Sequence, residues 1–167
     1  MGIVHTYRAG VIWDAADGVG TAGYTTYSRD HEVTFEDKPP LPGSADPAFR
    51  GDPGRYNPEE LLVAALSQCH MLWFLHLASR AGIVVRRYQD QGKGHMRVRA
   101  AGHGQFSEVV LRPTVLLGRA TDDAGQVVTD EALAGLHASA SQHCFIARSV
   151  NFRVRVDPAP LQVAART

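Results

Sequence analysis

The sequence contains few cysteines and no excess of either charge, and each shortage excludes a class of protein. Its two cysteines, Cys69 and Cys144, are 75 positions apart. The chain therefore has neither a disulfide scaffold nor a C-x-x-C pair for zinc or thioredoxin-like redox chemistry. The 17 basic residues balance 17 acidic ones among 167, and no basic run exceeds two residues. Nucleic-acid-binding proteins normally carry a basic excess, so we expect no nucleic-acid partner.

The chain also lacks a hydrophobic run of membrane-spanning length. Its most apolar stretch, residues 61–78, is apolar at 14 of 18 positions but includes Ser67, Gln68 and two histidines. About 20 apolar residues are needed to cross a bilayer, so we predict a buried core helix and no membrane partner. The first eight residues carry no apolar run of signal-peptide length, and we expect a cytoplasmic protein. The length predicts a single domain, 1–167.

The hydrophobic pattern predicts an α+β fold. In chain order we expect strands at 8–13, 22–28 and 31–35, a loop over 38–56, a helix from 58 to about 81, strands at 84–88, 95–100 and 106–117, a helix over 130–142, and a strand at 152–156. Because the strands cluster rather than alternate with helices, a parallel doubly wound fold is disfavoured.

The first predicted helix has clear start and stop signals. Asn57 can cap it, Pro58 suits its first position, and Glu60 stands three residues after the cap, as in a capping box. Gly82 is a natural stop. The middle of this helix is apolar all round, so it must be covered on every side. A second sheet or a second subunit is needed to cover it.

The two cysteines are the candidate reactive groups, and their residue types leave several readings open. Cys69 lies in the apolar helix, where a free cysteine can serve as a small packing residue. Cys144 follows the second helix, and a cysteine near a helix N-terminus can have a lowered pKa. Zinc ligation by Cys69, His70, His143 and Cys144 is a further alternative, although adjacent helical residues point about 100° apart and chelate poorly.

The segment from Asn57 to Cys69 reads NPEELLVAALSQC and resembles the signature of the OsmC/Ohr family of thiol-dependent peroxidases. In that family an N-P-E-[EQ]-L motif opens the central region, and a cysteine follows the first glutamate by ten positions, as Cys69 follows Glu59. The second family cysteine precedes a short turn and the final strand, as Cys144 does. The expected element order also agrees, so the resemblance covers nearly the whole chain.

The resemblance implies a fold, an assembly and a reaction. The fold is OsmC-like, with two antiparallel sheets around a central apolar helix in an intertwined homodimer. The reaction reduces organic hydroperoxides without a cofactor. Cys69 is the peroxidatic nucleophile and Cys144 the resolving thiol, and they form a disulfide that a dithiol reductant reopens (a lipoyl-type dithiol in Ohr-type members).

The resemblance also implies an arginine, held by a glutamate, beside the peroxidatic cysteine. Glu59 matches the glutamate, whereas Glu60 is assigned to capping. OsmC-type members carry the arginine in the loop before N-P-E, which here offers Arg50 and Arg55. We choose Arg50, although its spacing to Glu59 is one residue shorter than the family pattern. Arg29 is the third candidate.

Helix geometry constrains the role of Glu59. Ten residues of continuous helix put Glu59 about 15 Å along the axis from Cys69, so a shared site needs a broken helix or the glutamate of a second subunit. The neighbours of the cysteines depart from the better-known members: polar Gln68 and His70 flank Cys69, and Phe145 follows Cys144 in place of proline. These differences indicate a separate subfamily. The alternative function is a non-catalytic dimeric module that binds an apolar ligand or a small thiol.

Overall fold

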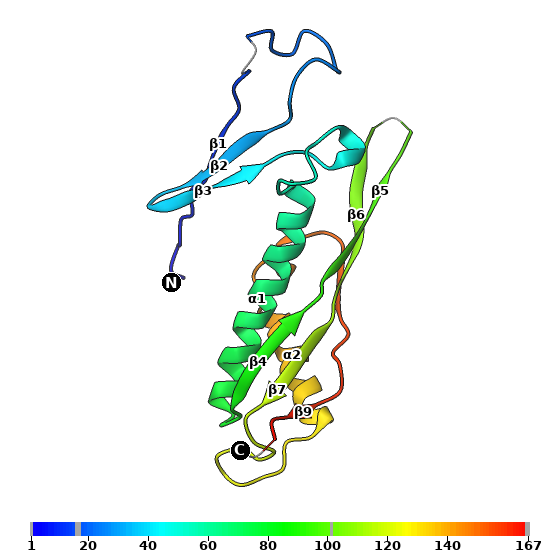
Figure 1. Ribbon diagram of the computed structural model, residues 1–167. Helices are drawn as coiled ribbons and strands as arrows, with labels where there is room; N and C mark the ends of the chain where they lie inside the picture. Colours follow the sequence, from blue (N-terminus) through cyan, green and yellow to red (C-terminus); the bar gives the residue numbers. More distant parts are fainter. Residues whose placement is uncertain (1, 16–17, 101, 166–167) are drawn as a thin grey trace. The chain divides into compact units, whose positions relative to one another are not determined.

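The computed structural model describes residues 2–15, 18–100 and 102–165 and has an α+β fold (Figure 1). The chain divides into two compact units, Met1–Leu61 and Leu62–Thr167. The first predicted helix crosses this division in the sequence. The prediction of a single domain over 1–167 remains a prediction.

The N-terminal unit contains an antiparallel sheet of order β1-β2-β3, with β1 at Gly10–Ile12, β2 at His31–Phe35 and β3 at Lys38–Gly43. The strands expected at 8–13 and 31–35 are present. The strand expected at 22–28 is wrong, because this segment forms turns. There the Thr26 hydroxyl donates to the carbonyl of Gly23 (2.9 Å), a local bond that competes with strand pairing.

Strand β3 corrects a second expectation, since we predicted that regular structure ends at Lys38. Its Pro39, Pro40 and Pro42 lack an N–H group, which suits an edge strand but not a central one. β3 is an edge strand that pairs with β2 alone among the strands. On its outer side the carbonyl of Pro42 accepts a hydrogen bond from the Tyr56 amide (3.1 Å). A short 3-10 helix, η1 at Pro47–Phe49, follows in the predicted loop.

Helix α1 runs unbroken over Pro58–Arg80, as the sequence signals predict. The capping box is present: the amide of Glu60 donates to Asn57 Oδ1 (2.8 Å), and the Asn57 amide donates to Glu60 Oε2 (3.3 Å). Gly82 follows the helix with φ of +67°, a left-handed conformation that glycine adopts most readily.

The C-terminal unit contains two sheets and the second helix. The strands are β4 (Val85–Asp90), β5 (Lys93–Val98), β6 (Gly104–Leu111), β7 (Pro113–Leu117), β8 (Arg153–Val156) and β9 (Gln162–Val163). The sheets have the orders β4-β7-β9 and β5-β6-β8. Because β9 pairs with β7, and β8 with β6, in parallel, both sheets are mixed. The α+β class is thus confirmed, but the strands of the described residues form three sheets, two of them mixed, where two antiparallel sheets were expected.

The strand expected at 106–117 is interrupted at Arg112, so its halves β6 and β7 belong to different sheets. The Arg112 amide donates to Oδ1 of Asp90 (2.6 Å) instead of to a neighbouring strand. Pro113 follows and has no amide hydrogen to offer. Helix α2 spans Asp130–His143 and is capped by the Thr129 hydroxyl, which accepts from the Ala132 amide (3.2 Å). This helix and its cap were predicted.

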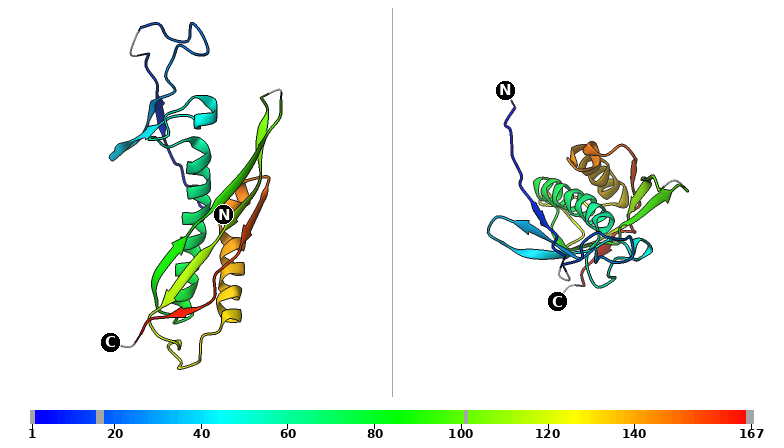
Figure 2. Two further views of the ribbon diagram at one scale, coloured as in Figure 1. Left: turned by 45° about the vertical axis from the view of Figure 1, so that its right-hand side comes forward. Right: turned by 90° about the horizontal axis from the view of Figure 1, so that it is seen from above.

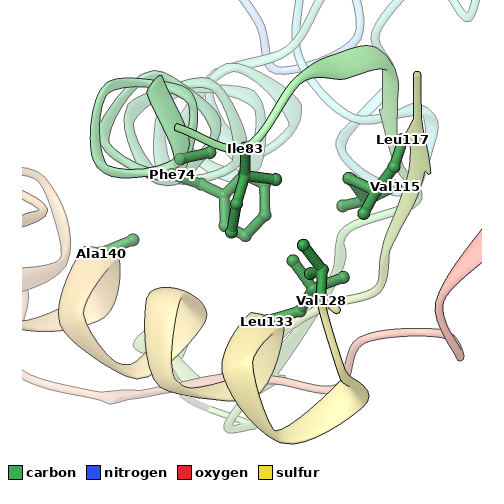
Figure 3. Packing of buried hydrophobic residues seen from close by; sticks show 8 residues of the cluster. Phe74, Ile83, Val115, Leu117, Val128, Leu133 and Ala140 are labelled. Carbon is green, nitrogen blue, oxygen red and sulfur yellow. The ribbon is translucent and has the colours of Figure 1, made fainter. Parts of the chain in front are cut away.

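The largest buried cluster of the C-terminal unit joins α1, α2 and β7. Phe74 of α1 packs with Leu133 and Ala140 of α2 and with Val115 and Leu117 of β7 (Figure 3). Figure 2 shows the two helices side by side. This packing brings the two cysteine-bearing helices together.

Within its own chain, α1 is fully buried along one stripe and exposed along another. Its buried residues recur every four positions, at Leu66, His70, Phe74 and Ala78, whereas Leu72 is 60% exposed. By length and composition α1 could cross a membrane, and only 22% of its most apolar window is buried. The expectation that this helix is covered on every side is thus not met by the single chain.

Candidate functional site

The structure brings the two cysteines together. Cys69 lies in the middle of α1, and Cys144 is the residue that ends α2. Their side chains are close enough to interact, and both are free thiols. Two residues 75 positions apart in the sequence are thus brought together as a pair of neighbouring thiols.

The two thiols differ in burial, and burial changes the pKa of Cys144. Cys144 is 1% exposed, whereas Cys69 is half-buried. Burial raises the pKa of Cys144 to about 11, and the hydrogen bond with Cys69 adds to this increase, while the amides of Ala147 and Ile146 oppose it. The expectation of a lowered pKa for Cys144 is therefore wrong. Backbone amides do point at its sulfur, with Ala147 N at 3.5 Å, but loss of solvation outweighs them.

Aromatic side chains flank the dithiol pair. Trp73 lies one helical turn after Cys69, and its ring contacts His143 (centroids 5.0 Å) and Phe145 (5.6 Å), the two neighbours of Cys144. His76 meets the edge of the same indole ring (5.7 Å). Phe145 is 66% exposed. The two neighbours of Cys144 in the sequence therefore pack in one aromatic cluster with Trp73 of α1.

His70 takes a different position from the one that the zinc alternative requires. Its Nε2 atom is hydrogen-bonded to Nδ1 of His137 on α2 (3.0 Å). Among the described residues, no group of three or more His, Cys, Asp or Glu side chains could hold a metal ion. The sequence did not single out His137. A usable signal is its spacing, since Leu133, His137 and Ala140 share the inner face of α2.

A separate cavity of about 380 Å³ lies in the N-terminal unit. Its lining includes the aromatic residues Trp13, Tyr27 and Phe49 together with Arg29, His31 and Glu59. The sequence analysis did not predict that these three aromatic residues line a common cavity, because long turns separate the segments that carry them. An arginine, Arg29, and the predicted glutamate, Glu59, thus line the same open, mostly apolar cavity.

Arg29 is held in this cavity by its neighbours. Its guanidinium lies 3.9 Å from the ring centroid of Tyr27 and 4.7 Å from that of Tyr24. It also donates to the carbonyls of Tyr27 (2.5 Å) and Tyr24 (2.7 Å). A guanidinium fixed on aromatic faces keeps its charge in an apolar setting.

The other two candidate arginines lie elsewhere. Arg50 is exposed, ends η1 with φ of +71°, and is not among the described residues that line the cavity. Arg55 pairs with Asp30 (3.5 Å) and Asp52 (3.9 Å). Of the three candidates, the structure places Arg29 with Glu59.

The loop that borders the cavity is held by buried polar contacts. Ser44 is fully buried; its hydroxyl donates to Asp30 (2.9 Å) and accepts from the Asp52 amide (3.0 Å). Gly51 is required by close packing, because a Cβ atom there would lie 1.6 Å from the carbonyl oxygen of Ala45.

Comparison with known proteins identifies a family that this chain matches. The sequence model of the family described as OsmC-like protein matches residues 51–159. Among curated proteins, none matches this chain. The structure of an OsmC-like protein of unknown function from Vibrio cholerae is 31% identical, with a TM-score of 0.82 over 93% of this chain and 100% of that chain.

More distant structures share the fold. An organic hydroperoxide resistance protein OsmC from Legionella pneumophila is 18% identical, with a TM-score of 0.65 over 98% of this chain and 100% of that chain. An organic hydroperoxide resistance protein from Elizabethkingia anophelis is also 18% identical, with a TM-score of 0.65 over 99% of this chain and 100% of that one.

Proposed function

Because this chain belongs to the family of OsmC-like proteins, we propose that it is a thiol-dependent peroxidase that reduces organic hydroperoxides to alcohols. The observation that carries this proposal is that the side chains of the two free thiols, Cys69 and Cys144, lie together and interact. The similarity in fold to organic hydroperoxide resistance proteins supports it.

The first step uses Cys69, the more exposed thiol. Its thiolate attacks the distal oxygen of the hydroperoxide, so that an S–O bond forms and the O–O bond breaks. The leaving alkoxide takes up a proton and departs as the alcohol, and Cys69 becomes a sulfenic acid. Cys144 keeps its proton in the resting state, because its pKa is about 11, and this leaves Cys69 as the nucleophile.

The second step uses Cys144. Its sulfur attacks the sulfenic sulfur, the S–S bond forms, and the hydroxyl group leaves with the Cys144 proton as water. The amides of Ala147 and Ile146 that point at this sulfur stabilise the charge that develops on it. An external dithiol then reduces the Cys69–Cys144 disulfide and becomes a disulfide itself. A lipoyl-type dithiol is our proposal for this reductant.

We assign the arginine and glutamate of the site to Arg29 and Glu59, which share one cavity. The unbroken helix α1 puts Glu59 about 15 Å along the axis from Cys69 of the same chain. We therefore propose that this pair acts on Cys69 of a second copy in a homodimer. There the guanidinium stabilises the thiolate and holds the peroxide oxygens.

The exposed face of α1 supports a second copy as its cover. Ala64, Gln68, Leu72 and His76 are exposed at intervals of four residues. Two of these four side chains are polar, which does not suit a lipid-facing surface. A protein partner can satisfy both the apolar and the polar members, so we retain the proposal of no membrane partner.

The test is a titration of free thiols before and after one equivalent of cumene hydroperoxide. We expect both thiols to disappear as an intramolecular disulfide. Cys69→Ser abolishes the reaction, whereas Cys144→Ser stops it at a sulfenic acid that dimedone traps. If the wild-type protein does not consume the peroxide at micromolar concentrations, the proposal fails. The alternative, a non-catalytic module that binds an apolar ligand or small thiol, is then favoured.

A further inference from the structure

Two buried histidines have no role in the chemistry proposed above. His70 of α1 is 1% exposed and His137 of α2 is 3% exposed. Their rings are parallel to within 6°, and His70 Nε2 lies 3.0 Å from His137 Nδ1. Burying a polar group lowers the stability of the fold unless the group is hydrogen-bonded. A buried pair of histidines therefore needs an explanation.

The surroundings keep both rings uncharged at neutral pH. Burial lowers the pKa of His70, although the charge of Asp90 opposes this shift, and burial lowers the pKa of His137 to about 4. Phe74 stacks on the His137 ring (centroids 4.2 Å, 20°), and the Tyr88 ring lies 6.4 Å from it. One proton shared between the two nitrogens then makes a single directional bond.

This bond joins the two elements that carry the reactive cysteines. His70 directly follows Cys69 on α1, and His137 lies seven residues before Cys144, about 10 Å or two turns along α2. The other contacts described between these helices are packing contacts, from Phe74 to Leu133 and Ala140 and between the rings of Trp73 and His143. Apolar contacts are non-directional, whereas a hydrogen bond holds its two atoms within a few tenths of an ångström.

We propose that the His70–His137 hydrogen bond is a positioning device for the redox pair. It fixes the register of α2 against α1, so that the sulfur of Cys144 stays within reach of the oxidised Cys69. Neither histidine touches the substrate, so the bond acts on the second step of the reaction and not on the first. The expected effect on the reaction rests on the proposed peroxidase function. The effect on the relative position of the two cysteines does not depend on that function.

The consequence is a specific kinetic defect. Without the bond, peroxide oxidises Cys69 at the normal rate, but Cys144 reacts more slowly with the sulfenic acid of Cys69. A misplacement of about 1 Å between reacting groups can slow a reaction roughly a hundredfold. A long-lived sulfenic acid reacts with more peroxide and proceeds to the irreversible sulfinic acid.

The test compares three variants in single-turnover reactions. His137→Leu removes the bond, and His137→Asn retains a polar atom near the Nδ1 position. Leu133→Ala removes packing from the same cluster, one turn away, and leaves the bond intact. In His137→Leu we expect the loss of peroxide to stay within about twofold of wild type, while disulfide formation slows roughly ten- to a hundredfold.

We further expect His137→Asn to recover part of the rate and Leu133→Ala to form the disulfide at the wild-type rate. The proposal is overturned if His137→Leu forms the disulfide as fast as wild type, or if Leu133→Ala slows it equally. Disulfide formation in a glutathione redox buffer separates this test from the peroxidase proposal. This equilibrium reports how well the two thiols are positioned even if the protein consumes no peroxide. In His137→Leu we expect it to shift from the disulfide toward the dithiol, compared with wild type.

Discussion

At the scale of single residues, the two cysteines are chemically unequal although both are free thiols. Cys144 is buried and holds its proton, whereas Cys69 is half-buried. In the proposed reaction, this inequality favours Cys69 as the sulfur that meets the substrate and Cys144 as the resolving thiol. The burial of each sulfur cannot be predicted from its position in the sequence, because it depends on how the two helices pack.

The protonation of Cys144 should depend on Cys69. In Cys69→Ala the hydrogen bond and the charge of the neighbouring sulfur are removed, so the pKa of Cys144 should fall below about 11. It should stay above the ordinary value, because burial is the largest cause of the shift. A titration of thiolate absorbance against pH measures this. An unchanged pKa would show that the two sulfurs do not interact.

Protonation of His137 should limit stability in acid. Its pKa is about 4 in the folded chain against 6.5 for an unperturbed histidine, so the unfolded chain takes up the proton first as the pH falls. Stability is therefore full above about pH 6.5 and is lost down to about pH 4, by about 3 kcal/mol. Urea unfolding of wild type at these two pH values should show the loss.

His137→Asn provides the comparison, since it cannot titrate in this range. Its stability should depend less on pH than that of wild type, whereas Leu133→Ala should be weakened by a similar amount at both pH values. His70 contributes in the same direction as His137, because its pKa is also lowered by burial. Equal pH dependence in wild type and His137→Asn would contradict the prediction.

At the scale of elements, the helices follow local signals more closely than the strands do. The capping box of Asn57 and Glu60 and the stop at Gly82 define α1 from residues a few positions apart. Strand β3, in contrast, forms from a proline-rich segment because β2 offers it an edge. Strands depend on partners that are distant in the sequence, so their prediction is weaker.

The loop beside the N-terminal cavity should not tolerate a side chain at Gly51. In Gly51→Ala the new Cβ atom would meet the Ala45 carbonyl at 1.6 Å, so the loop must open. We expect faster proteolysis of this loop and weaker peroxide binding. Gly135→Ala is the control, because nothing lies within 4 Å of its Cβ position in α2. It should stabilise the protein by roughly 0.5 to 1 kcal/mol. Equal behaviour of the two variants would refute the packing argument.

At the scale of the whole molecule, the proposed homodimer is supported by the incompletely covered helix α1 and by the distance along it between Glu59 and Cys69. If Glu59 serves the Cys69 of another chain, two inactive variants should complement each other. Mixed dimers of Cys69→Ser and Glu59→Gln contain one intact site, so an equimolar mixture should recover about a quarter of the wild-type activity.

The controls for this complementation are the separate variants, each of which should remain inactive after the same refolding or exchange treatment. A mixture that stays inactive, although mixed dimers are present by mass spectrometry, would show that Glu59 acts within its own chain or has a capping role only. The same experiment measures the oligomeric state, and a strictly monomeric protein would contradict the proposed dimer.

The sequence by itself determined the α+β class, both helices with their caps, and the family to which Glu59 and Cys69 point. These features depend on spacings of a few residues, where the geometry of the helix leaves little freedom. Only the tertiary structure decided that the thiols of Cys69 and Cys144 lie together, that His70 is hydrogen-bonded to His137, and that Arg29 shares a cavity with Glu59. Each of these pairs joins residues at least 30 positions apart, and such contacts are set by the packing of whole elements. The sequence contains only two cysteines, and they form a dithiol pair only because α1 packs against α2.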